Sequence, residues 1–137
     1  MVDREEISSD QVKPCWSIDL DWYQPNNRSF FTLARGCLCP KCRKQLKVDE
    51  GEVSATDLLV AINDCCSQKP GFITGETPIL ESVFRFFLAS GNQPLELEEL
   101  GKQVSEWRGG DSYRTSVEML SRLLERDRYY GIRQAAG

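Results

Sequence analysis

Three cysteines lie within residues 37–42, and two of them, Cys39 and Cys42, have the spacing of a metal-binding turn. Two residues separate these thiols, so a tight turn brings both sulfurs within reach of one ion, about 2.3 Å away. Pro40 fixes one φ angle of that turn. Thiolates are the form that binds metals, and nearby cations favour them. The surrounding bases have no acid between them: Arg35, Lys41, Arg43, Lys44 and Lys47. The pattern predicts half of a metal site.

The second half of the site must come from other cysteines, because the chain contains no histidine. We predict zinc as the cofactor, with an iron–sulfur cluster as the alternative. The predicted ligands are Cys39, Cys42, Cys65 and Cys66. Inside a regular helix, neighbours such as Cys65 and Cys66 point about 100° apart, so both can bind one ion only if the helix frays there. Cys37 and Cys15 are reserve ligands, and Cys37 is also a candidate redox partner.

The six cysteines favour ligands over disulfides, because the N-terminus is too acidic and polar for a signal peptide and clustered thiols in reducing compartments often bind metals. The alternative is that some cysteines, Cys15 above all, are small buried apolar residues. The longest apolar run, 58–62, is too short to span a membrane. We therefore expect a cytoplasmic protein without membrane partners. Its net charge of −4 argues against binding polyanions by bulk electrostatics.

The first predicted module spans residues 15–67, after a disordered lead at 1–14. Alternating apolar residues predict a half-buried strand with its buried side formed by Trp16, Ile18, Leu20 and Trp22. With Phe30 and Phe31, the two tryptophans are expected to form a small core over the metal. Ser54 and Asp57 have the spacing of a capping box, which predicts a helix from there to about Ser67.

Residues 68–76 are predicted to be a linker, because they contain Pro70, Gly71 and Gly75. Thr77 is then expected to cap a helix that starts at Pro78. Its apolar residues follow helical spacing: Leu80, Val83, Phe84, Phe87 and Leu88. A second helix is marked by Leu97, Leu100, Val104 and Trp107. A third is expected to open at Asp111 or Ser112 and to bury Val117, Leu120 and Leu124. A short strand, 129–133, follows, and 134–137 form a tail.

Three helices, the last two joined by a short glycine turn, and a closing strand resemble the winged-helix type of helix-turn-helix domain. Segment 94–101 resembles the edge strand and second-helix start of such domains, and 120–130 resembles the end of a recognition helix entering the wing. The expected fold class is α+β, mostly α. It combines a small knuckle-like or ribbon-like cysteine module with one helix and a three-helix winged-helix domain at 77–133.

The resemblance implies that the third helix offers contact residues to DNA or to a protein partner. The predicted contact residues are Tyr113, Arg114, Arg122 and Arg133. The alternative is a solvated face, because Glu118 is spaced to pair with both Arg114 and Arg122.

These features predict a non-enzymatic regulator or adaptor, related to transcription, that binds DNA, protein or both. The alternatives are a thiol-based metal or redox sensor and a pure protein-interaction subunit of a larger complex. We expect no catalytic residues and no small-molecule substrate, because the chain lacks histidine, a phosphate-binding glycine loop and a nucleophile elbow.

Overall fold

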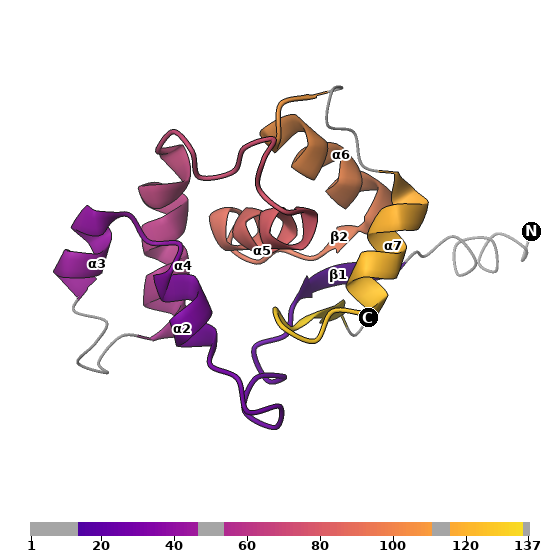
Figure 1. Cartoon of the computed structure of the whole chain (residues 1–137). Helices are drawn as coiled ribbons and strands as arrows, with labels where there is room; N and C mark the ends of the chain where they lie inside the picture. Colours follow the sequence, from indigo (N-terminus) through magenta and orange to yellow (C-terminus); the bar gives the residue numbers. More distant parts are fainter. Residues whose placement is uncertain (1–13, 47–53, 111–115, 136–137) are drawn as a thin grey trace, which may run out of the picture.

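The computed structural model describes residues 14–46, 54–110 and 116–135. These residues are mostly helical and include a small antiparallel sheet, which confirms the predicted α+β, mostly α class (Figure 1). The strands are β1 (Cys15–Ile18), β2 (Leu95–Glu96) and β3 (Ile132–Gln134). The helices are α2 (Phe30–Arg35), α3 (Pro40–Leu46), α4 (Ala55–Asp64), the 3₁₀ helix η2 (Cys66–Gln68), α5 (Ile79–Ala89), α6 (Leu97–Trp107) and α7 (Val117–Glu125). Within the described ranges, no helix has the length and apolar character that crossing a bilayer requires.

The sheet places the first strand of the chain between the other two, in the order β2-β1-β3. Both pairings are antiparallel, with Trp16 opposite Leu95 and Ile18 opposite Ile132. Asn92, in the turn before β2, extends this pairing through its side chain. Its amide accepts from the N–H of Ile18 at 2.8 Å and donates to the carbonyl of Ile18 at 2.9 Å. The front and back halves of the chain therefore share one sheet.

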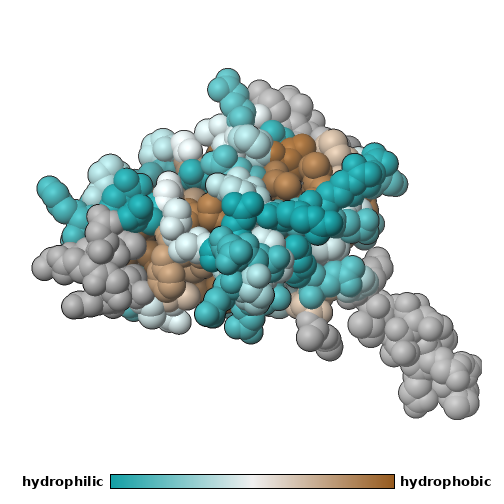
Figure 2. Space-filling view, turned by 60° about the horizontal axis from the view of Figure 1, so that its bottom comes forward, coloured by the Kyte–Doolittle hydropathy of each residue, from teal (hydrophilic) through white to brown (hydrophobic). Residues whose placement is uncertain are grey.

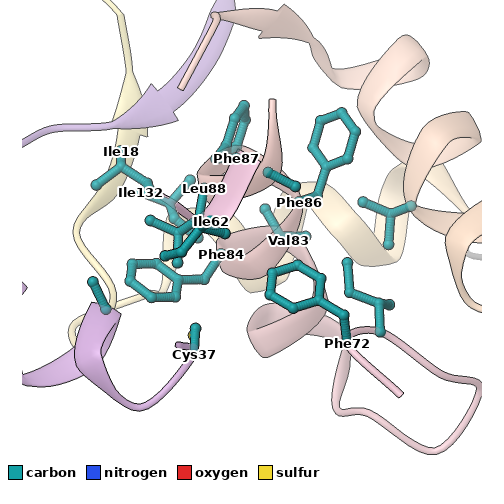
Figure 3. Packing of buried hydrophobic residues seen from close by; sticks show 14 of the residues in the cluster. Ile18, Cys37, Ile62, Phe72, Val83, Phe84, Phe86, Phe87, Leu88 and Ile132 are labelled. Atoms are coloured by element: carbon teal, nitrogen blue, oxygen red, sulfur yellow. The ribbon is translucent and has the colours of Figure 1, made fainter. Parts of the chain in front are cut away.

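The core surrounds α5, whose apolar residues pack against both the sheet and α4. Figure 3 shows Val83, Phe84 and Phe87 of this helix among side chains that include Ile62 of α4 and Ile132 of β3. The helix buries more than one face, because Phe86 and Ala89 are also buried. Buried residues of the front and back halves belong to a single cluster.

The start of α4 and the end of α6 agree with the prediction, whereas α4 ends at Asp64 rather than near Ser67 and α5 begins one residue later than expected. The capping box of α4 is present, with Ser54 and Asp57 each accepting a backbone N–H of the other, and α6 ends at Trp107, just before the glycine pair. In α5, Pro78 is the N-cap and the helix begins at Ile79. In α7, Ser116 is the N-cap and its hydroxyl accepts the N–H of Met119. The predicted start at Asp111 or Ser112 lies outside the described residues.

The front half differs from the sequence prediction in its local structure. A single helix was expected there, whereas the described residues form α2, α3 and α4. The strand predicted to reach Trp22 ends at Ile18, and the chain then turns, so Leu20 is 39% exposed while Tyr23 is buried. Phe31 is also exposed rather than part of the predicted core. These departures make the segment after β1 a surface loop.

Candidate metal centre

Four cysteines lie at the ends of two helical segments that meet in space. Cys39 directly precedes α3, and Cys42 lies in its first turn, so the predicted metal-binding turn is the start of a helix rather than a knuckle. Cys65 is the C-cap of α4, and Cys66 is the first residue of η2. The Sγ atoms of Cys39 and Cys65 are 3.9 Å apart, although the residues are 26 positions apart in the sequence.

The thiols of Cys39, Cys42 and Cys65 form a group in which all sulfurs lie within 4.8 Å of one another. Such a group could hold a metal ion. Cys65 can take part because α4 stops at Asp64: its φ of −133° and ψ of −64° are not helical. The regular helix therefore ends just before Cys65, which is the condition under which Cys65 and Cys66 could both bind one ion.

The thiol of Cys66 borders the same group. It is 1% exposed, and its sulfur accepts the backbone N–H of Cys39 at 3.1 Å. After burial, the neighbouring thiols of Cys65, Cys66 and Cys39 are the next causes that raise the pKa of Cys42. The four predicted ligand side chains thus lie together. The sulfurs of three of them are within 4.8 Å of one another, and the sulfur of the fourth, Cys66, accepts a hydrogen bond from the backbone of Cys39.

The thiols differ in how readily they ionise. The backbone N–H of Cys42 donates to the sulfur of Cys39, and this is the largest cause that lowers the pKa of Cys39 to about 6. Burial raises the pKa of Cys42 and of Cys66. The sequence suggested that basic side chains would favour the thiolate of Cys39, but the largest contribution comes from a backbone group. One base is engaged elsewhere, because Arg43 donates to the carbonyl of Arg35 at 3.0 Å.

The two reserve ligands lie outside this thiol group. Cys37 is buried, and its sulfur lies 3.7 Å from the carbonyl oxygen of Leu33, one turn earlier in α2. Burial raises its pKa to about 11. Figure 3 shows Cys37 next to hydrophobic side chains of the core. Cys15 is in β1, opposite Glu96 of the neighbouring strand. Cys15 is only partly buried and alternates with the buried Trp16 and Ile18, so the alternative that it is a small buried core residue is wrong.

The predicted partner-binding residues are only partly described. Tyr113 and Arg114 lie outside the described residues. Arg122 is exposed on α7, next to the exposed acid Glu118 one turn earlier. Arg133 is half-buried in β3, and its guanidinium stacks on the ring of Trp22, 4.9 Å from the ring centre.

Comparison with known protein families, curated proteins and solved structures does not identify this chain, because none of them matches it.

Sequence reasoning missed a second arginine–aromatic contact on the surface. The guanidinium of Arg28 lies 4.9 Å from the centre of the Tyr129 ring. No local pattern could have revealed this pair, because the partners are about a hundred residues apart. The same holds for Arg133 and Trp22. The sequence shows only that each of the two segments contains aromatic and basic residues, which does not indicate that they pair.

Proposed function

We propose that this chain is a non-enzymatic, zinc-stabilised adaptor in which Cys39, Cys42, Cys65 and Cys66 hold one structural zinc ion. The observation that carries the proposal is the convergence of these thiols from two segments of the chain. Thiolates suit zinc, which takes four of them in a tetrahedral arrangement with bonds of about 2.3 Å. When bound, the ion would supply a crosslink between the start of α3 and the end of α4.

A four-sulfur site is typical of a structural ion, because it leaves no open coordination position for a substrate. The N–H of Cys39 that donates to the sulfur of Cys66, and the N–H of Cys42 that donates to the sulfur of Cys39, suit such a site. Backbone donors of this kind orient the ligands and stabilise their negative charge. We therefore assign the site to stability of the fold rather than to catalysis.

The partner-binding part of the proposal rests on the back half of the chain. Helices α5, α6 and α7, together with the three strands, support its resemblance to a winged helix, in which α7 would be the contact helix. The exposed residues that α7 presents include Glu118, Arg122 and Glu125, two acids and one base. This composition favours a protein partner over duplex DNA, whose binding depends on phosphate neutralisation. An adaptor in a transcription-related assembly fits these features.

Cobalt substitution tests the proposed ligand set. Cobalt bound by thiolates gives charge-transfer absorption whose intensity follows the number of sulfur ligands, so Cys66→Ser should reduce it by about a quarter from a four-thiolate value. The matched control is Cys37→Ser, which should leave the spectrum unchanged. An unchanged spectrum in Cys66→Ser, or a loss in Cys37→Ser, would show that the ligand set is wrong. Fluorescence anisotropy with duplex DNA tests which partner the chain binds. Salt-dependent DNA binding that is lost when Arg122 is substituted would show that the partner is DNA rather than a protein.

A second candidate function, a thiol redox sensor, is favoured by the 3.9 Å separation of the Cys39 and Cys65 sulfurs. Hydrogen peroxide would oxidise these two zinc-bound thiolates to a disulfide; the two electrons that they give up, with two protons from solvent, reduce the peroxide to two water molecules. The metal would then lose two of its four donors. Peroxide-dependent zinc release, measured with a colorimetric chelator, tests this function. Zinc that stays bound after peroxide treatment excludes it, and visible absorption of anaerobically purified protein would instead indicate an iron–sulfur cluster.

A further inference from the structure

Two arginine–aromatic stacks form one surface at the end of the sheet, away from the thiol group. Arg28 lies over the ring of Tyr129, and Arg133 lies over the ring of Trp22, each at 4.9 Å from the ring centre. The residues come from the loop between β1 and α2 and from the segment between α7 and the chain end. We call Trp22, Arg28, Tyr129 and Arg133 the arginine–aromatic surface.

The rings of the buried Tyr23 and the half-buried Tyr130 hold the two outer rings of this surface in place. Trp22 packs edge-on against Tyr23, and Tyr129 packs edge-on against Tyr130. The hydroxyl of Tyr23 in turn donates to the carbonyl of Tyr130, which ties the two inner residues together. The rings are therefore fixed before any ligand arrives, which lowers the entropy cost of binding.

The turn that carries Tyr129 is fixed by a buried carboxylate. Asp127 is 2% exposed and accepts the N–H groups of Tyr129, Tyr130 and Ile132, each at 2.9 Å. Arg133 lies 3.8 Å from the same carboxylate while its guanidinium faces Trp22. Both sides of the surface thus depend on one rigid turn.

The surface is accessible and locally basic. Tyr129 is 46% exposed. The exposed bases of the two segments are Arg28, Arg126 and Arg128, with Arg133 partly exposed. The exposed acids are Asp19 and Asp21, and the buried Asp127 lies 3.8 Å from Arg133, so the bases of the two segments exceed the acids by one. The loop between β1 and α2 forms the lower edge of Figure 1, and Figure 2, which brings that side forward, shows hydrophilic residues interrupted by hydrophobic ones.

We propose that the arginine–aromatic surface binds single-stranded nucleic acid. The exposed ring of Tyr129 offers a stacking surface to an unpaired base, and the guanidinium groups of Arg28 and Arg133 offer donors to the neighbouring phosphates. A duplex would use only the arginines, because its bases are already stacked. An acidic peptide would likewise leave the rings without a specific role. Because the net charge of the whole chain is −4, affinity would come from this local contact and would fall steeply with salt.

Fluorescence anisotropy with the zinc-loaded full chain and a labelled oligo(dT) of about 15 nucleotides tests the proposal. Tyr129→Ala should weaken binding by about tenfold, the size expected for loss of one stacked base. Arg28→Gln should reduce the slope of log K against log salt by about 0.7, the value for one phosphate contact on a single strand. A purely structural role of Arg28 would not change that slope.

The matched control is Lys102→Gln, which removes a charge of the same sign from an exposed position of α6 and should leave oligo(dT) binding unchanged. Circular dichroism and urea unfolding must show that Tyr129→Ala and Arg28→Gln are folded; Tyr129→Leu, which keeps apolar area without a ring, replaces Tyr129→Ala if that variant unfolds. The proposal is overturned if the wild-type chain does not bind oligo(dT) at about 50 mM salt. Competition by polyglutamate as effective as that by unlabelled oligo(dT) would also overturn it and assign the surface to acidic peptides.

Discussion

Removing the carboxylate of Asp127 should destabilise the fold more than removing any exposed acid. The side chain of this residue is fully buried and accepts three backbone N–H groups, two at one oxygen and one at the other. These bonds fix the turn between α7 and β3. Asp127→Ala leaves all three amides without their acceptor, and Asp127→Asn leaves the N–H of Ile132 facing an amide donor.

The magnitude follows from the number and type of these hydrogen bonds. A hydrogen bond to a charged group contributes about 1.5–3 kcal/mol, so three give about 4.5–9 kcal/mol before relaxation. The turn lies at the surface of the domain and can open to let water reach the amides. We therefore expect a loss of about 3–5 kcal/mol for Asp127→Ala, at the upper end for single substitutions. Asp127→Asn keeps two of the three bonds and should lose about 2 kcal/mol.

Urea unfolding followed by tryptophan fluorescence measures both losses. The control is Asp21→Asn, the same chemical change at an exposed position, which should stay within about 0.5 kcal/mol of the wild type. If Asp127→Ala unfolds at the same urea concentration as Asp21→Asn, the carboxylate does not hold the turn. A smaller loss in Asp127→Ala than in Asp127→Asn would also contradict the hydrogen-bond reasoning.

Three further predictions concern the same end of the fold. Asn92→Gly keeps the positive φ of 60° but removes both hydrogen bonds to Ile18, and should lower the free energy of unfolding by about 1–3 kcal/mol in urea titrations. Gly131→Ala places a Cβ 2.8 Å from the ring of Trp22 at a φ of +70°, and should cost about 2–5 kcal/mol from strain and overpacking; wild-type stability would contradict this geometry. Burial raises the pKa of Tyr130 to about 12, whereas tyrosine in the unfolded chain ionises near 10, so the unfolded state loses its proton first and stability should fall as pH rises between these values. Tyr130→Phe should show a smaller fall than the wild type in urea titrations across that pH range, and an equal fall would exclude Tyr130 as the cause.

Helices with strong periodicity were predictable from the sequence. In α6 the apolar residues recur at helical spacing and two glycines follow the last turn, and in α4 Ser54 and Asp57 form a local capping motif. These signals depend on residues within a few positions of each other, which is why a single sequence reveals them. The approach of Cys65 to Cys39 and Cys42 was predictable for another reason. In a chain without histidine, a metal site that begins with two thiols is expected to be completed by other cysteines.

Elements fixed by distant contacts were not predictable in the same way. Helices α2 and α3 have six and seven residues, too short to be stable alone, and exist because the core packs against them. The alternation from Trp16 to Trp22 indicated a longer strand, but β2 and β3 offer partners only as far as Ile18. The predicted strand start at Tyr129 was wrong because Asp127 takes the N–H groups that pairing would need.

The most direct test of the metal centre is native mass spectrometry of the purified chain before and after chelation, combined with thiol alkylation. We predict one zinc ion per chain and protection of Cys39, Cys42, Cys65 and Cys66 from alkylation until the metal is removed. A protein that is folded without metal and whose six cysteines all react at once would contradict the account.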